Sequence, residues 1–213
     1  MGRRYAELMF TPAVVARQAR HGACAGARLE QSPADGQPER LGGAEAAFIG
    51  DGISFVIATV GATGQPHVQH RGGAPGFLRV LDPGRPGFAD FRGNRHYVSM
   101  GNLDGNARGC PLQLDHAEPG RLKIVGRARV LSPEDEPALA QAVRLPSHVA
   151  AVERIVEIAV ECLDWNCPPT HARPLHAGTV LAGDGGPDGM VARCWGRAGP
   201  ARRAAGPAWG RAG

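Results

Sequence analysis

The sequence contains a single lysine, Lys123, so almost all of its positive charge is carried by arginine. We attribute this bias, together with the abundance of Ala, Gly and Pro, to the base composition of the gene rather than to function. No apolar run reaches the roughly 20 residues that a membrane-spanning helix needs. No apolar signal-peptide core follows the arginines near the N-terminus. These absences lead us to expect a soluble, cytoplasmic protein without a membrane partner.

The sequence also has few cysteines and little excess charge. The five cysteines are odd in number and scattered, without the spacing of a secreted disulfide-rich domain, so we expect mostly reduced thiols. The net charge is +4, but the last segment, 178–213, holds five arginines and two aspartates. The other residues carry 19 basic and 18 acidic side chains and are nearly neutral. We therefore expect no nucleic-acid partner.

Composition divides the chain into three parts. Residues 1–42 combine a helix-compatible segment, broken at Pro12, with a connecting stretch rich in Gly, Ala and Pro. Residues 43–177 hold the regular apolar patterns and form the predicted domain, which begins with a short helix at 44–49. Residues 178–213 are of low complexity, have little to bury and are predicted to be disordered.

Strand patterns dominate the central part. Runs rich in β-branched and apolar residues predict strands at 53–60, 66–70 and 77–81. Apolar and polar residues alternate at 121–131 and 152–162, which predicts two further strands. The apolar side chains expected to share a face of the first are Leu122, Ile124, Ala128 and Val130. Those expected to share a face of the second are Val156, Ile158, Val160 and Cys162. Six or so antiparallel strands with short turns and a few flanking helices predict a mainly β fold, a small barrel.

Two segments between these strands carry proline signals. Ser132, followed by a proline and acidic residues, predicts the N-cap of a helix that runs to about Val143. Pro111 lies in the segment 107–114 and cannot donate a hydrogen bond to a sheet ladder. We therefore interpret that segment as an edge strand, a bulge or a damaged strand.

Two arginine-glycine clusters are the most informative feature for function. Arg71-Gly72-Gly73 follows a predicted strand, and Arg92-Gly93-Asn94-Arg95 precedes a predicted helical turn. Arginine offers a charged planar fork to phosphate, glycine permits close approach to backbone N–H groups, and a helix N-terminus favours anions. Ser99 and Asn102 lie about one turn further on. The pattern indicates a phosphate-bearing ligand, although arginines beside glycines at turns also arise from base composition. Neither cluster is a P-loop or a dinucleotide fingerprint.

Metal and nucleophile signals are weaker. The spacing C-x4-C-x3-H-x4-H that begins at Cys162 has zinc-compatible residue types, but Cys162 falls on the apolar face of its strand. We interpret it as a core cysteine followed by a loop with incidental histidines, and expect no metal. His67 and His70 are three apart on a strand, so they point to opposite faces and cannot chelate together. No G-x-S-x-G elbow or recognisable Cys–His pair is present, so no catalytic residue is named.

The chain carries four segments in a fixed order: GFLRVLD, GFADFRGNRHYVSMGNL, RLKIVGRARVL and LDWNCPP. In this order they resemble the pyridoxamine 5′-phosphate oxidase-like, FMN-binding split-barrel flavoproteins. The stretch HRGGAPGFL, residues 70–78, is similar to the HRGGPPGFL motif of one subgroup. The resemblance covers roughly Met9 to Pro168 and fades after Pro168.

The resemblance implies a six-stranded antiparallel Greek-key split barrel that forms a homodimer with FMN at the subunit interface. By motif position, it implies three groups of cofactor-binding residues. Those near the flavin and its phosphate are His70, Arg71, Gly72 and Gly73. A second phosphate-side segment consists of Phe91, Arg92, Gly93, Asn94 and Arg95, with Tyr97, Ser99 and Asn102 close by. Residues reaching the cofactor from the partner chain are Trp165 and Asn166.

The resemblance also implies an FMN-dependent oxidoreductase acting on an unknown small substrate, with NAD(P)H as a candidate reductant. Pyridoxamine phosphate itself is not expected, because the late stretch ARPLHAGTV offers no convincing match to the further arginine and histidine of the true oxidase. Two alternatives stay open: a non-catalytic flavin- or haem-binding split-barrel module, and a split-barrel scaffold that has lost its ligand.

Overall fold

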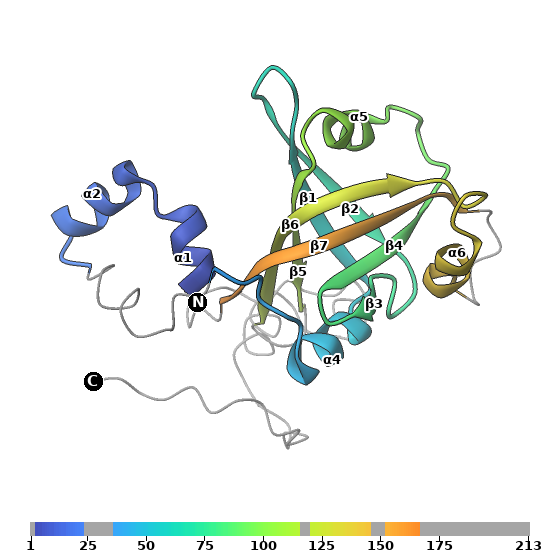
Figure 1. Cartoon of the computed structure of the whole chain (residues 1–213), viewed down its shortest axis with the longest axis horizontal. Helices are drawn as coiled ribbons and strands as arrows, with labels where there is room; N and C mark the ends of the chain where they lie inside the picture. Colours follow the sequence, from blue (N-terminus) through green and yellow to red (C-terminus); the bar gives the residue numbers. More distant parts are fainter. Residues whose placement is uncertain (1–2, 24–35, 116–119, 146–151, 167–213) are drawn as a thin grey trace, which may run out of the picture. The chain divides into compact units, whose positions relative to one another are not determined.

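The structure is a computed structural model, which describes residues 3–23, 36–115, 120–145 and 152–166 (Figure 1). The predicted tail 178–213 lies outside the described residues. The described strands are β1 (Ser54–Val60), β2 (Pro66–Gly72), β3 (Arg79–Asp82), β4 (Arg85–Phe91), β5 (Arg108–Leu114), β6 (Arg121–Leu131) and β7 (Val152–Asn166). The described helices are α1 (Arg3–Met9), α2 (Pro12–Arg20), α4 (Gly43–Asp51), α5 (Val98–Gly105) and α6 (Pro137–Val143).

All strand pairs in the described part of the chain are antiparallel and belong to one sheet, in the order β2-β1-β5-β6-β7-β4-β3. Two hairpins, β1–β2 and β3–β4, precede α5, and a meander of β5, β6 and β7 is inserted between them. This arrangement is a split barrel with a Greek-key connection, so the predicted mainly β fold is confirmed. Seven strands are described where six or so were expected: β3 corresponds to the strand predicted at 77–81, and β4, which pairs with it, was not among the predicted strands.

The core lies inside the curved sheet, between the inner faces of the strands. Phe88 is fully buried on β4, and its ring centroid lies 5.1 Å from that of Phe55 and 5.8 Å from that of Phe77. The predicted inward face of β6 is confirmed for Leu122, Ile124 and Ala128, which are 0–3% exposed. Because successive side chains on a strand alternate, the opposite face of β6 carries the polar residues.

Strand β5 is an interior strand and not an edge. It pairs with β1 on one side, where Ile57 lies opposite Pro111, and with β6 on the other. The ladder to β6 pairs Gly109 with Gly126 and then Leu112 with Lys123, and it is interrupted between these pairs. Proline lacks an N–H group, so the gap accommodates Pro111 without displacing the strand. The edge reading of 107–114 was therefore wrong, whereas the local disruption that proline predicts is present.

Strand β7 contains a register shift that the alternation in the sequence did not reveal. Val125 pairs with Cys162, but the next residue, Gly126, pairs with Val160, so one residue of β7 is left over. An inserted residue in one strand turns all later side chains to the other face. Cys162 is therefore on the opposite face from Val160, and the prediction that they share a face was wrong. The shift also brings Leu163 into the core.

Proline and its neighbours set the helix boundaries. The predicted break at Pro12 separates α1 from α2, whose N-cap Thr11 accepts a hydrogen bond from the Val14 N–H at 3.4 Å. The predicted helix after Ser132 begins only at Pro137, with Glu136 as its N-cap. Proline disfavours the helical conformation in the residue before it, so the helix cannot start earlier. Ser132 instead accepts a hydrogen bond from the Glu134 N–H at 3.1 Å within a turn.

Candidate functional site

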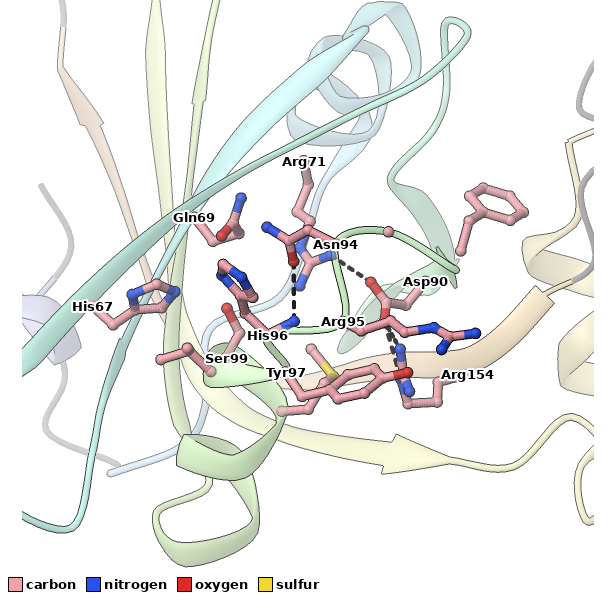
Figure 2. A pocket seen from close by; sticks show the side chains of 14 residues that line it. His67, Gln69, Arg71, Asp90, Asn94, Arg95, His96, Tyr97, Ser99 and Arg154 are labelled. Carbon is pink, nitrogen blue, oxygen red and sulfur yellow. Dashed lines mark hydrogen bonds and ion pairs between the residues drawn. The ribbon is translucent and has the colours of Figure 1, made fainter.

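A cavity of about 220 Å³ lies where β2, β4, β7 and the N-terminus of α5 meet (Figure 2). Most of its lining is polar or charged, which distinguishes it from the apolar interior beside it. Its lining residues are His67, Gln69, Arg71, Asp90, Phe91, Gly93, Asn94, Arg95, His96, Tyr97, Val98, Ser99, Met100 and Arg154.

The cavity lies between strands that are far apart in the sheet order. Strand β2 is at one end of that order and β4 is next to the other end. His67, Gln69 and Arg71 alternate along β2 and are partly buried, and they lie opposite inward-facing residues of β1. His70 points to the other face of β2 and is exposed. The expectation that His67 and His70 face opposite ways is confirmed.

Asp90 on β4 connects the two sides of this gap. Its side chain is 3% exposed. One carboxylate oxygen, Oδ1, accepts a hydrogen bond from Nη1 of Arg71 on β2 at 2.5 Å. The other, Oδ2, accepts from Nε and Nη2 of Arg154 on β7, at 3.0 and 2.8 Å. A buried carboxylate needs such partners, and two arginines provide them here.

The segment before α5 has an unusual backbone. Arg95 and Tyr97 both have positive φ angles, 62° and 52°, which are uncommon for residues other than glycine. Asn94 accepts a hydrogen bond from the His96 N–H through Oδ1 at 3.1 Å and so stabilises the turn (Figure 2). Backbone conformations of this kind cluster at ligand sites because the surrounding structure maintains them.

The N-terminus of α5 opens into the cavity. The first backbone hydrogen bond of the helix joins the Gly101 N–H to the Tyr97 carbonyl at 2.9 Å. The N–H groups of Val98, Ser99 and Met100 precede that bond, and all three residues line the cavity. No side chain caps this end, since Tyr97 is the N-cap residue. Free N–H groups and the helix dipole together favour an anion at this position.

Tyr97 joins the start of α5 to β7. Its hydroxyl donates to Oε1 of Glu153 at 2.9 Å, and the guanidinium of Arg154 lies 4.5 Å from the centre of its ring. This hydrogen bond, together with the nearby arginines, holds the pKa of Glu153 below its ordinary value. The contact therefore involves a charged carboxylate at neutral pH.

Three buried polar atoms around the cavity have no hydrogen-bond partner within the described residues. They are Nε2 of His67, Nε of Arg71 and Oγ of Ser99. Ser99 is only 3% exposed. Buried polar atoms are almost always satisfied in folded proteins, because leaving them unpaired costs about 1–3 kcal/mol each. Seven such atoms occur among the described residues, and three of them belong to residues that line this cavity, where a polar ligand would provide partners.

The sequence prediction of site residues separates into two groups. Seven of the predicted residues line the cavity, namely Arg71, Phe91, Gly93, Asn94, Arg95, Tyr97 and Ser99. Six others are outside its lining: His70, Gly72, Gly73, Arg92, Asn102 and Trp165. Arg92 is near enough to act on the charge of Glu153. Asn166 ends β7, and its side chain is outside the described part.

The predicted residues outside the cavity have other contacts. The Gly73 N–H donates to the Ile53 carbonyl at 2.8 Å, so it is not free for a ligand. Asn102 donates to Oγ1 of Thr59 at 3.1 Å and attaches α5 to β1. Trp165 donates through Nε1 to Oε1 of Glu45 at 2.6 Å, and its ring contacts Phe48 edge-on at 4.8 Å. The indole N–H is thus already engaged within its own chain.

Seven lining residues were not predicted: His67, Gln69, Asp90, His96, Val98, Met100 and Arg154. His67 and Gln69 share the inward face of β2 with Arg71, so strand alternation alone would have found them. Asp90 directly precedes the predicted segment. Arg154 is 64 positions from Asp90 in the sequence, and no local pattern connects them.

The described part of the chain shows no group of three or more His, Cys, Asp or Glu side chains that could hold a metal ion. The prediction about the Cys162 spacing pattern falls mostly on residues outside it. Cys162 itself is buried, and burial raises the pKa of its thiol to about 12. Among the described helices, none is long and apolar enough to cross a membrane.

No family model and no curated protein matches this sequence. Similar solved structures include a variant of HupZ from Group A Streptococcus, with 19% identity over 59% of this chain and 99% of that chain and a TM-score of 0.46. A putative pyridoxamine 5′-phosphate oxidase from Lactobacillus delbrueckii has 15% identity over 60% of this chain and 99% of that chain, with a TM-score of 0.45. An F420 reductase has 15% identity, coverages of 58% and 97%, and a TM-score of 0.41. The family expected from the motifs is thus among the similar structures.

Proposed function

We propose that the cavity binds the phosphate end of FMN and that the protein is an FMN-dependent oxidoreductase acting on an unknown small substrate. One observation carries the proposal: unpartnered buried atoms of Arg71, His67 and Ser99 line the same cavity as the free N-terminus of α5. Phosphate offers several acceptor oxygens, and these groups provide a charged fork, a hydroxyl and backbone N–H donors.

The charges around the cavity support an anion. Arg71, Arg95 and Arg154 line it, against the carboxylate of Asp90 and the nearby carboxylate of Glu153. Arg95 has no hydrogen-bond or ion-pair partner among the described residues. These five side chains leave one positive charge uncompensated, and the N-terminus of α5 adds about half a charge more. A phosphate monoester would balance this excess.

The size of the cavity supports binding of only part of the cofactor within one chain. Sites for drug-sized ligands enclose roughly 300–1,000 Å³, and this cavity has about 220 Å³. The phosphate and sugar chain fit that volume, and the ring system would extend beyond it. Phe91 and Tyr97 are among the lining residues and would offer aromatic surfaces to a flat ring.

We propose that a second copy of the chain completes the enclosure. The outer face of the β1–β2 hairpin presents Val68, which is 64% exposed and lies opposite Ala58, and Val60, which is 37% exposed. These neighbouring apolar side chains form the surface that we propose the second copy covers. Light scattering should find a dimer, and Val68→Glu should shift it toward monomer and weaken FMN binding. A wild-type monomer that binds FMN fully would refute this part.

Bound FMN would supply hydride chemistry, and the protein would position it. In this proposal Arg71, Arg95 and Ser99 bind the phosphate, and the α5 N-terminus orients it. Tyr97, fixed by Glu153 and Arg154, would border the ring side of bound FMN and limit the access of water there. NAD(P)H remains the candidate reductant, and no residue is assigned to proton transfer.

The decisive experiment compares FMN with riboflavin, which lacks the phosphate. Purified protein is reconstituted with each, and bound flavin is read from its spectrum between 300 and 600 nm. We expect binding of FMN to exceed binding of riboflavin, and the double variant Arg71→Ala, Arg95→Ala to lose that preference. Arg127→Ala, which removes an exposed arginine of β6 outside the cavity lining, is the matched control. Equal affinity of the double variant and the wild type for FMN would refute the phosphate assignment.

A non-catalytic haem-binding module is the second candidate. His67 favours it, because its buried Nε2 lacks a partner within the described residues and lines the cavity. Imidazole nitrogen is a common haem ligand. The same spectrum distinguishes the two ligands, since haem has an intense Soret band that flavin lacks. Binding of haem that His67→Ala abolishes, without binding of FMN, would favour this candidate.

A further inference from the structure

Arg71 is held by only one edge of its guanidinium group. Its Nη1 donates to Asp90, whereas its Nε is buried and has no partner within the described residues. An arginine can donate in parallel from Nε and Nη2, and this is the edge that Arg154 uses toward Asp90. In Arg71 the corresponding edge is left for a ligand. Figure 2 shows Arg71 extending from β2 into the cavity.

Asp90 is itself fixed from the opposite side. Its Oδ2 receives two hydrogen bonds from Arg154, and it is 3% exposed. Arg154 is in turn held by Glu153, which accepts from Nη1 at 3.1 Å, and by the ring of Tyr97. The carboxylate therefore has little freedom to follow Arg71, and Arg71 must adopt the orientation that Asp90 imposes.

We propose that Asp90 is a positioning residue: held by Arg154, it orients Arg71 so that the Nε–Nη2 edge receives an anionic oxygen pair, as in a phosphate. This inference deepens the proposed function, because it concerns the same anion site, but it depends on phosphate and not on the flavin. It also explains why an acidic residue lies in a site for an anion. Arg71 lies on β2, at one end of the sheet order, and the ion pair links it to β4, near the other end.

A competing role for Asp90 predicts the opposite result. If Asp90 only compensated charge, or occupied Arg71 in place of the ligand, its neutralisation would strengthen anion binding, because the local net charge would become more positive. If Asp90 positions Arg71, neutralisation weakens anion binding despite that added positive charge. The sign of the change in affinity therefore separates the two roles.

The test uses the full chain, with inorganic phosphate as the probe and chloride at equal ionic strength as the reference. Phosphate affinity is measured by titration calorimetry for the wild type, Asp90→Asn, Arg71→Ala and the double variant. We expect Asp90→Asn to lower the affinity about tenfold or more, the usual weight of a charge-assisted hydrogen-bond pair. Because Asp90 acts through Arg71, the double variant should bind no more weakly than Arg71→Ala alone.

Two further variants keep the result interpretable. Asp82→Asn also removes a carboxylate that pairs with an arginine, Arg85 at 2.6 Å, outside the cavity lining; it should leave phosphate affinity unchanged. Asp90→Glu keeps the charge and displaces its position, and it replaces Asp90→Asn if the latter does not fold. It should also weaken binding.

The outcomes are distinct. Unchanged or stronger phosphate binding by the Asp90 variants, additive losses in the double variant, or a wild type that does not bind phosphate would overturn the positioning role. A wild type that binds phosphate with the expected pattern but does not bind FMN would leave this role standing and refute the proposed function.

Discussion

The two glycine-containing clusters give a prediction that separates packing from ligand binding. A Cβ added at Gly73 would lie 2.7 Å from Cδ2 and 3.1 Å from Cγ of Phe77, and 3.3 Å from Cδ1 of Leu145. Phe77 and Leu145 are 3% and 2% exposed, so neither can move aside freely. Crowding a packed core by one methyl group costs about 1–3 kcal/mol. We therefore expect Gly73→Ala to lower the free energy of unfolding by that amount.

Gly93 provides the contrast. A Cβ added there meets nothing within 4 Å, and the residue lines the cavity. We expect Gly93→Ala to change stability by less than about 0.5 kcal/mol, the usual size for a surface substitution. It should instead weaken FMN binding, because the methyl group occupies space beside the ligand.

Urea unfolding monitored by circular dichroism measures the stability of both variants, and flavin titration under native conditions measures their affinity. Each kcal/mol should also lower the melting temperature by about 2–4 °C for a chain of this size. A Gly73→Ala variant that is as stable as the wild type but binds FMN poorly would refute the reasoning. It would assign Gly73 to the ligand, as the sequence first suggested.

Three further predictions concern the core, a charged contact and a thiol. Phe88→Ala should cost about 3–5 kcal/mol in unfolding free energy, because the ring is fully buried between two others; a cost below about 1 kcal/mol in chemical unfolding would contradict the core assignment. Tyr97→Phe should lower the free energy of unfolding at neutral pH. This difference from the wild type should shrink as the pH falls below the ordinary Glu153 pKa of 4.5 and through its lower folded value, because the carboxylate becomes protonated. Unfolding of both proteins from pH 3 to 7 measures the difference, and a pH-independent difference would contradict the prediction. Cys162, with a pKa raised by burial to about 12, should resist iodoacetamide at pH 8 in the native state and react on unfolding, as peptide mass spectrometry would show; rapid native labelling would show the thiol to be accessible.

The parts of the fold that could be predicted are those that leave a pattern in the local sequence. Alternation over 121–131 gave β6 with the bounds that the structure has, because one of its faces is buried along its length. The left-over residue in β7 leaves no such trace, since Glu161 is compatible with the outward face of a regular strand. Pro111 correctly predicted a local disruption of the strand pairing but wrongly suggested an edge strand, because a ladder can omit a hydrogen bond without placing the strand at an edge. The start of α6 was missed because Ser132 resembles an N-cap, whereas Pro137 disfavours the helical conformation in the residue before it and so delays the start.

Half of the residues that line the candidate site could be predicted from the sequence, for a related reason. Arg71, Arg95 and Ser99 belong to short patterns that suggest anion binding by residue type alone. Asp90 and Arg154 acquire a role only through tertiary contact. Asp90 is 19 positions from Arg71 and 64 from Arg154. Taken alone, an aspartate near a phosphate site argues against that site.

The contacts of Asp90 lead to the opposite conclusion, that this aspartate helps to form the site. An isolated arginine on an edge strand has many rotamers, and ordering its side chain for a ligand costs up to about 2 kcal/mol of conformational entropy. A buried carboxylate that accepts a hydrogen bond from one edge of the guanidinium fixes the side chain before the ligand binds, and it leaves the other edge free. The cost is one negative charge in an anion site, which Arg154 offsets at the same carboxylate. In this site the buried acid is therefore expected to strengthen phosphate binding through Arg71, and the response of phosphate affinity to Asp90→Asn tests that expectation directly.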